Sequence, residues 1–359
     1  MTNLSRRDFN YLAGSSLFGL TFPRLTFGNG KLEKKIVVGQ VGTAHSHASA
    51  KMETIRKMSE RFEVVGVVES DPDVKRVNQK KFVYTGLKWM SEEELLNLPG
   101  LEGVLVETDL NFLIPSAMRC IEAGKHIHLD KPPGKSLGDL KTLMKLAADK
   151  QLIVQIGYMF RYNPAFQFCL QAVAEGWLGQ VFEVDGVISK VVKPERRQKL
   201  AENYGGSMML LGCHLIDILV AICGKPNRVM HYSRQTFPDQ DTLNDNELAV
   251  FEYENGVATV RSTLNEVEGK ERRQFVVCGT NGTIEIKPLE PPVLKLTLDR
   301  PSMGYYKGLQ IISLPDMPGR YDDQLLDFAG MVRGNKVPEY TFEHDIGVHE
   351  TLLQACGII

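Results

Sequence analysis

The N-terminal third of the chain contains a strand, a glycine turn, a helix and a second strand in an order that restricts the fold more than any other stretch. Lys34 to Val41 has the apolar character of a buried strand, and Phe62 to Val68 is a valine-rich strand that closes on Glu69. Between them, a turn that begins at Gly42 leads into a helix that we expect to end near Met58. This order is typical of a dinucleotide-binding unit, in which backbone N–H groups and a helix N-terminus receive a pyrophosphate.

The turn departs from the usual glycine fingerprint. Read as Gly-x-Gly-x-x-Gly, its three positions are Gly42, Ala44 and His47, so only the first is glycine. Glu69 lies 22 residues after His47 (69 − 47), close to the spacing of about 20 expected for an acid that binds the adenosine ribose. Its carboxylate would repel a 2′-phosphate, so we expect NAD rather than NADP. The residues that we expect to bind the cofactor are Gly42, Thr43, Ala44, His45, Ser46, His47, Glu69, Thr108, Asp130 and Lys131.

The same turn carries a His-Ser-His cluster. Two histidines this close together could belong to a metal site, but the sequence places no third ligand near them, so we predict no metal. We expect Ser46 to cap the helix and His45 or His47 to line the cofactor turn.

Helices and strands continue to alternate as far as Gly157, which predicts a parallel, doubly wound sheet. The expected elements are a strand over Gly103–Glu107, a helix over Pro115–Ala123 with proline in its first turn, a strand over His126–Leu129, a Ser136-capped helix through Asp149 and a strand over Ile153–Gly157.

Lys131 follows one of these strands directly. Pro132 disfavours helical geometry at Lys131, so the lysine is held extended at the carboxyl end of the strand. In open α/β sheets, ligands bind at that end. The alternative is an ordinary surface lysine in a turn.

The pattern changes after Tyr158. A helix to Glu175, a strand over Val181–Lys190 and a charged surface loop over Lys193–Asn203 are expected before an apolar helix over Ser207–Cys223. Six strands then follow between residues 229 and 298, two pairs of them joined by Asn-Gly turns, and two helices end the chain. This half is therefore predicted to be an α+β domain with a large, mostly antiparallel open sheet, one face of which is free for self-association into a homo-oligomer.

The apolar helix contains a histidine and an aspartate. His214 and Asp217 are three residues apart, so they share a helix face, and both are costly to bury unless they are partnered. Either they serve a site, or His214 is a hydrogen-bonded core histidine.

Taken together, these motifs resemble the glucose–fructose oxidoreductase, inositol dehydrogenase and MocA family over nearly all of the chain after its first 30 residues. The motifs that carry the resemblance are the Glu102–Thr108 strand, Ala123-Gly124-Lys125-His126, Asp130-Lys131-Pro132, Gly157-Tyr158-Met159-Phe160-Arg161-Tyr162-Asn163-Pro164 and Gly212-Cys213-His214-Leu215-Ile216-Asp217.

The resemblance implies an NAD(P)-dependent oxidoreductase that moves hydride between nicotinamide and a carbinol of a sugar, polyol or glycoside. It implies a Rossmann domain over residues 31–157 and a substrate and oligomerisation domain over residues 158–359. Lys131 would contact cofactor and reacting hydroxyl, and His214 would be the acid/base. Asp130 replaces the family's glutamate but can still reach a ribose hydroxyl. We expect Arg161 and Asp217 to contact substrate.

Three positions depart from the family pattern. Leu210 stands where many members have an aspartate four residues before the histidine, and Asp109 and Leu113 replace a frequent proline and histidine. Two alternatives to the oxidoreductase follow. One is a glycosidase that retains NAD through oxidation, elimination, addition and reduction. The other, suggested by Leu210, is a relative that binds NAD or a sugar without turnover.

Composition and the N-terminus set the remaining expectations. The 42 basic and 44 acidic side chains give a net charge of −2, so we expect no nucleic-acid partner, and no apolar run after residue 30 is long enough for a membrane span.

Ser5-Arg6-Arg7-Asp8-Phe9 before an apolar run resembles a twin-arginine export signal over residues 1–30, the alternative being a basic arm. We therefore expect a periplasmic protein, or a cytoplasmic one if that leader is not functional. An exported protein would have to hold its NAD tightly. The six cysteines are expected to be buried free thiols.

Overall fold

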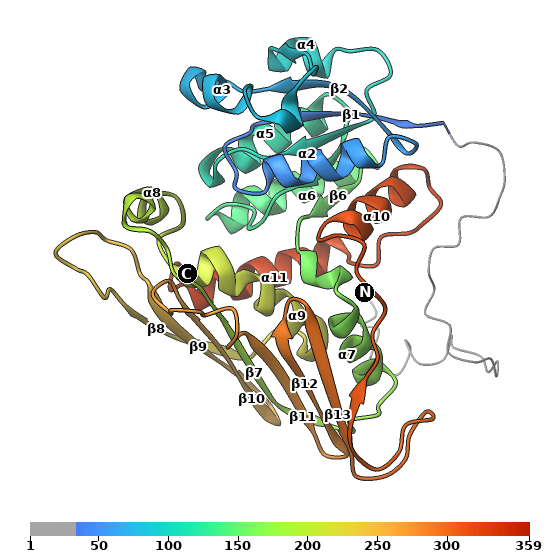
Figure 1. Ribbon diagram of the computed structural model, residues 1–359, viewed down its shortest axis with the longest axis vertical. Coiled ribbons are helices and arrows are strands. Elements are labelled where there is room, and N and C mark those ends of the chain that lie inside the picture. Colours follow the sequence, from blue (N-terminus) through green and yellow to red (C-terminus); the bar gives the residue numbers. More distant parts are fainter. Residues whose placement is uncertain (1–33) are drawn as a thin grey trace. The chain divides into compact units, whose positions relative to one another are not determined.

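The computed structural model describes residues 34–359, which contain two sheets with helices packed on them (Figure 1). The predicted export signal over residues 1–30 lies outside the described residues. Within the described range, no helix combines the length and the apolar character needed to cross a bilayer.

The first sheet has six parallel strands in the order β3-β2-β1-β4-β5-β6, which confirms the doubly wound prediction. Its strands are β1 (Ile36–Val41), β2 (Phe62–Val68), β3 (Trp89–Met90), β4 (Gly103–Val106), β5 (His126–Leu129) and β6 (Val154–Ile156). Its helices are α2 (Ala48–Lys57), α3 (Pro72–Asn78), α4 (Glu92–Leu96), α5 (Leu110–Glu122) and α6 (Leu137–Asp149), with a 3₁₀ turn over Phe82–Tyr84. The short elements α3 and β3 were not predicted.

Two helix starts in this half differ from the prediction. The residue that caps α2 is His47 rather than Ser46, and no side chain bonds the free N–H groups there. Helix α5 begins at Leu110, so Pro115 lies in its interior rather than in its first turn. Apolar residues on both sides of the proline, Leu113 and Ala117 among them, are fully buried, and this packing holds the helix together across the missing N–H.

The second sheet has eight strands in the order β14-β13-β12-β11-β7-β10-β9-β8. Only the β7–β10 pair is parallel, so the prediction of a mostly antiparallel sheet is confirmed. The strands are β7 (Val181–Ser189), β8 (Arg228–Arg234), β9 (Asn246–Tyr253), β10 (Gly256–Thr263), β11 (Gln274–Gly279), β12 (Gly282–Leu289), β13 (Pro292–Leu298) and β14 (Gly308–Ile312), the last of which was not predicted. The helices of the second half of the chain are α7 (Pro164–Ala174), α8 (Pro194–Tyr204), α9 (Cys213–Cys223), α10 (Asp322–Val332) and α11 (Phe342–Ala355), and a 3₁₀ turn spans Met159–Tyr162.

The predicted surface loop over Lys193–Asn203 is wrong, because these residues form helix α8. Pro194 opens the helix at its first position, and Gly205 ends it at a φ of +77°. The helix buries Arg197, Leu200 and Tyr204 on one side, so its many charges lie mainly on the exposed side. The apolar helix was also expected to be continuous from Ser207, but one turn of π-helix, Met208–Gly212, precedes α9.

Helix α10 returns from the C-terminal part of the chain to the first sheet. Gln155, on β6, donates from Nε2 to the Gln324 carbonyl oxygen (3.0 Å) and to Asp327 Oδ2 (3.2 Å). Figure 1 shows α10 lying beside α2 and β6. The last part of the chain thus covers the edge of the first sheet.

All six cysteines are free thiols, as predicted. Cys120, Cys169 and Cys213 are buried, whereas Cys223, Cys278 and Cys356 are partly exposed, so the expectation that all six are buried is wrong for three of them.

Candidate active site

The glycine turn after β1 is closely packed against the end of β4. Gly42 has a φ of +85°, and a Cβ at this position would lie 2.5 Å from Thr108 Cγ2 and 2.6 Å from Thr108 N. Only glycine fits there, because both the backbone conformation and the space exclude a side chain. The first position of the glycine fingerprint therefore lies in a tight turn. This turn brings Thr108 to the edge of the first sheet where the cofactor is expected to bind.

Glu69 is fixed beside this turn by hydrogen bonds that it accepts from Thr43. Its Oε2 accepts hydrogen bonds from Thr43 N and Thr43 Oγ1, both at 2.7 Å, and its Oε1 accepts from Asp71 N at 3.1 Å. Asn78 Nδ2 donates to Thr43 Oγ1 at 2.8 Å and so supports the turn from helix α3. Asn78 was not singled out in the sequence, because helix α3 itself was missed.

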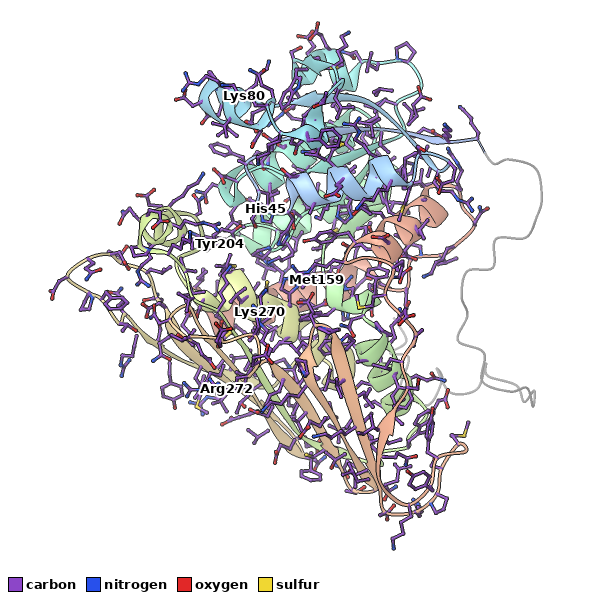
Figure 2. The ribbon with its side chains drawn as sticks, viewed as in Figure 1. His45, Lys80, Met159, Tyr204, Lys270 and Arg272 are labelled. Carbon is purple, nitrogen blue, oxygen red and sulfur yellow. The ribbon has the colours of Figure 1, made fainter. Side chains whose placement is uncertain are left out.

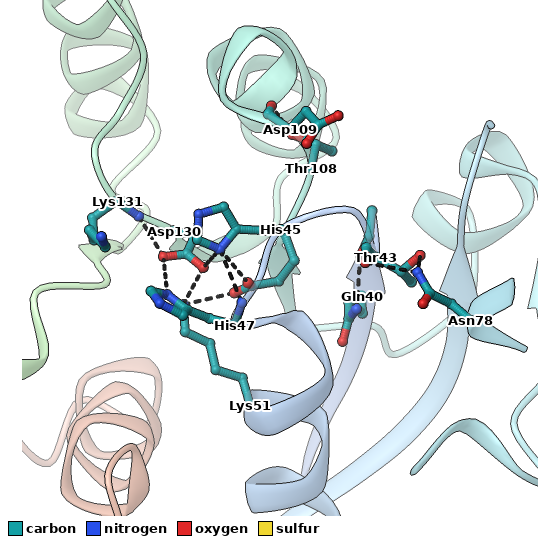
Figure 3. A network of polar contacts seen from close by, with 12 residues as sticks. Gln40, Thr43, His45, His47, Lys51, Asn78, Thr108, Asp109, Asp130 and Lys131 are labelled. Carbon is teal, nitrogen blue, oxygen red and sulfur yellow. Dashed lines mark hydrogen bonds and ion pairs between the residues drawn. The ribbon is translucent and has the colours of Figure 1, made fainter. Parts of the chain in front are cut away.

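A buried ionic cluster underlies the opposite side of the turn (Figure 3). Asp130 Oδ2 lies 2.5 Å from His45 Nδ1 and 3.2 Å from Lys51 Nζ, and Asp130 Oδ1 lies 3.3 Å from His47 Nδ1. Lys51 Nζ also contacts Glu107 Oε1 at 2.8 Å. Sequence reasoning missed Lys51, although this lysine interrupts the buried face of α2 and could have been noticed for that reason.

The two buried carboxyl groups of the cluster, Glu107 and Asp130, have pKa values shifted in opposite directions. Burial raises the pKa of Glu107 well above its usual range, and the nearby Asp130 raises it further. Burial acts in the same direction on Asp130, but His45 and Lys51 outweigh it and hold the pKa of Asp130 well below its usual range. Asp130 is thus the ionised partner of the Lys51 ammonium.

The two histidines of the turn do have a third potential metal ligand near them, contrary to the prediction from the sequence. The fold brings His45, His47 and Asp130 together, with their ligand atoms within 4.8 Å of one another. The Lys51 ammonium, however, already neutralises the Asp130 carboxylate. We retain the prediction of no resident metal for this different reason.

Lys131 is held at both of its nitrogens and is only 2% exposed. Its backbone N–H donates to Asp130 Oδ1 at 2.7 Å, and its Nζ donates to the Leu210 carbonyl oxygen at 2.9 Å. Leu210 lies in the π-helical turn before α9. The residue that replaces the family's aspartate therefore still provides an acceptor for Lys131, through its backbone.

His214 lies in the first turn of α9 and is 3% exposed. Its ring centroid is 5.4 Å from that of Phe160 and 6.3 Å from that of Tyr158. Burial, with a further contribution from Lys131, holds the pKa of His214 well below 6.5. Its Nδ1 has no hydrogen-bond partner among residues 34–359. The side chain is therefore an uncharged imidazole that can accept a proton.

Both of these residues line one cavity of about 280 Å³. The cavity is lined by residues from both halves of the chain, and Figure 2 labels three of them, His45, Met159 and Lys270. The complete lining is His45, Ser46, His47, Lys131, Met159, Ile188, Lys190, Leu210, Leu211, His214, Lys270, Arg273, Glu290 and Arg320. Sequence reasoning found five of these and missed the charged residues that the second half of the chain contributes.

Arg161 and Asp217 do not line this cavity. Arg161 donates from Nη2 to Asp217 Oδ1 at 2.5 Å and to Asp345 Oδ1 at 2.6 Å, and all three side chains are buried. The guanidinium carbon also lies 3.9 Å from the Tyr340 ring centroid. The two residues that we expected to contact substrate are thus bound to each other.

Comparison with known proteins agrees with this geometry. Residues 36–158 match the family described as "Oxidoreductase family, NAD-binding Rossmann fold", and residues 166–285 match the "GFO/IDH/MocA C-terminal domain". The chain belongs to the GFO/IDH/MocA family. The resemblance drawn from the sequence motifs is confirmed.

Individual relatives are distant. The chain is 24% identical over 279 residues to scyllo-inositol 2-dehydrogenase (NAD⁺) of Bacillus subtilis, covering 74% of this chain and 79% of that protein. It is 29% identical over 150 residues to the uncharacterised oxidoreductase YhhX of Escherichia coli, but this alignment spans only 43% of YhhX. Levoglucosan dehydrogenase, solved with NADH and levoglucosan, has a similar fold at a TM-score of 0.77 and 16% identity, covering 90% of this chain and 97% of that one.

Proposed function

We propose that this protein is an NAD-dependent oxidoreductase that acts on a carbinol of a sugar, polyol or glycoside. One observation carries the proposal: Lys131 and His214 line the same cavity as His45, Ser46 and His47 of the cofactor turn. A strand-end lysine, an uncharged histidine and a dinucleotide turn are the parts that such a reaction needs.

The residues present fit a dinucleotide. The turn at Gly42 excludes any Cβ and presents its backbone at the N-terminal end of α2, as pyrophosphate binding requires. Glu69 is held beside it as an acceptor for the adenosine ribose, and Thr108 and Asp130 lie along the same edge. Bound NAD would supply the hydride acceptor or donor. The ionisable Glu69 supports NAD over NADP, because a 2′-phosphate would meet a carboxylate.

The proposed role of each protein group follows from its place in the cavity. During oxidation, His214 would take the proton of the substrate hydroxyl, since its imidazole is uncharged and lines the cavity. Lys131, positioned by the Leu210 carbonyl, would stabilise the negative charge that develops on the substrate oxygen.

The proposal is tested by identifying bound nucleotide and then screening substrates. We expect denatured, freshly purified protein to release NAD, and the holoprotein to reduce it when given sugars, polyols or glycosides. A glycoside that is cleaved while NAD is retained unchanged would favour the glycosidase alternative instead. Protein that is free of nucleotide at every stage of purification would contradict tight binding, which a protein exported to the periplasm requires.

The pH profile of oxidation should report the low pKa of His214. A base whose folded pKa is lowered stays active above that pKa and loses activity only as the pH falls through it. We therefore expect kcat/KM for oxidation to stay constant as the pH falls through about 6.5, the ordinary pKa of histidine. His214→Ala should abolish turnover, and His231→Ala, which alters an exposed histidine on β8, should not. A loss of wild-type activity with a midpoint at about pH 6.5 would contradict this prediction.

We also propose that the protein forms a homo-oligomer through the open face of the second sheet. This face exposes large apolar side chains on several strands, for example Phe182, Leu309 and Ile311, the last of them 72% exposed. Large apolar side chains exposed on one face of a sheet favour a protein–protein interface. A monomer in light scattering at micromolar concentration would refute the proposal.

A further inference from the structure

The charged residues of the cavity are nearly all of one sign. Five are cations, Lys131, Lys190, Lys270, Arg273 and Arg320, and one is a carboxylate, Glu290. Four of the five cations belong to the second half of the chain rather than to the first sheet. Lys190 follows β7, Lys270 and Arg273 lie between β10 and β11, and Arg320 precedes α10.

The single carboxylate is already shared by the two arginines. Glu290 Oε2 lies 2.9 Å from Arg320 Nη2 and 3.7 Å from Arg273 Nη1. Arg273 also donates from Nε to the Ser189 carbonyl oxygen at 3.1 Å. These contacts fix the guanidinium groups in place but leave no acid in the lining to pair with the lysines.

The three lysines of the cavity lack a carboxylate partner among the described residues. Lys131 Nζ donates to a neutral carbonyl, and no ion pair joins Lys190 or Lys270 to an acid in residues 34–359. Burial, together with Lys131 and the neighbouring arginines, lowers the pKa of Lys190 to about 8. A half-buried ammonium among other cations is stabilised when an anion binds beside it.

We propose that the substrate of this site carries an anionic group, a carboxylate or a phosphate, which Lys190 and Arg273 bind while its hydroxyl faces Lys131 and His214. This inference rests on the proposed oxidoreductase function. Lys190 and Arg273 belong to the second half of the chain, whereas the turn at Gly42 that would receive the cofactor's pyrophosphate belongs to the first. A cavity of about 280 Å³ is near the lower end of the usual range for ligand pockets, about 300–1,000 Å³, and suits a single sugar ring.

Calorimetry on the full-length, NAD-loaded protein tests the proposal, with all ligands compared at one ionic strength and the measurements then repeated at higher salt. The ligands are hexuronates, hexose 6-phosphates and the corresponding neutral hexoses. We expect at least one anionic series to bind about tenfold more tightly than its neutral counterpart, which is about 1.4 kcal/mol, and to weaken as salt is added. The series that binds identifies the group as carboxylate or phosphate. Neutral hexoses that bind as tightly as both anionic series, or a failure of every anionic ligand to bind, would overturn the proposal.

Two matched variants separate recognition from folding. Lys190→Gln should weaken binding of the anionic ligand about tenfold and leave binding of NAD and of neutral hexoses unchanged. Lys145→Gln, which removes one charge from the exposed face of α6, should change none of these. An equal loss for neutral and anionic ligands in Lys190→Gln would assign Lys190 a structural role and overturn the proposal.

Absorbance of reduced nicotinamide in the same samples tests the oxidoreductase function separately from the recognition of an anionic group. Anionic sugars that bind without reducing NAD would support the charge recognition and contradict the oxidoreductase function. Reduction by neutral hexoses alone would support the function and contradict the charge recognition.

Discussion

Lys131→Met is expected to lower kcat by about a hundredfold to a thousandfold, the loss typical when one donor to a developing oxyanion is removed. Methionine is an unbranched side chain only one heavy atom shorter than lysine, so the cavity should nearly keep its shape while the charge is lost. The backbone N–H that donates to Asp130 is unchanged, so the ionic cluster under the turn should persist. Single-turnover reduction of bound NAD measures the effect directly.

Controls for Lys131→Met must show that the site is intact. We expect the variant to release as much NAD on denaturation as the wild type, and its unfolding temperature to be close to that of Lys145→Met, which alters an exposed lysine on α6. A variant that turns over at nearly the wild-type rate would remove Lys131 from the proposed chemistry. Lost NAD together with lost turnover would instead make Lys131 a cofactor-binding residue only.

The contact between Lys131 and Leu210 bears on the non-catalytic alternative. That alternative was suggested by the loss of the family's aspartate at position 210. In the structure the π-helical turn directs the Leu210 carbonyl oxygen to Lys131 Nζ at 2.9 Å. A neutral acceptor fixes the ammonium without cancelling its charge, so replacing the aspartate by leucine need not disable the lysine.

Local sequence signals predicted the parts of the molecule that depend on near neighbours. The turn at Gly42 and the spacing from His47 to Glu69 located the dinucleotide turn, because a tight turn and an acid one strand away are parts of one βαβ unit. The alternating pattern and the Asn-Gly turns likewise predicted both sheets. Helix α8 was missed because its surface charges hid the buried positions Leu200 and Tyr204.

The partners in the site could not be predicted, because they come from distant parts of the chain or from the backbone. Lys51 reaches Glu107 across 56 positions and Arg161 reaches Asp345 across 184. A carbonyl acceptor such as that of Leu210 has no sequence signature at all. The cations of the cavity lie mainly on connecting segments, where charged residues are expected for solubility alone.

Arg161→Met is expected to lower the free energy of unfolding by about 3–5 kcal/mol, the cost of leaving buried charges without their partner. Arg161 is the cation that Asp217 and Asp345 share, and all three are buried. Arg161 lowers the pKa of Asp217 against the opposing effect of burial, whereas burial leaves the pKa of Asp345 raised. Loss of Arg161 would thus leave Asp217 as the uncompensated charge. Chemical denaturation followed by fluorescence measures the change.

Adding Asp217→Asn to Arg161→Met separates an ion pair from a substrate contact. The double variant removes the unpaired charge as well, so it should recover part of the lost stability, and the coupling between the two sites should exceed about 1 kcal/mol. Below its unfolding transition, the single variant should bind substrate with the wild-type affinity, because neither residue lines the cavity. Unchanged stability with a large rise in KM would instead support the substrate contact expected from the sequence.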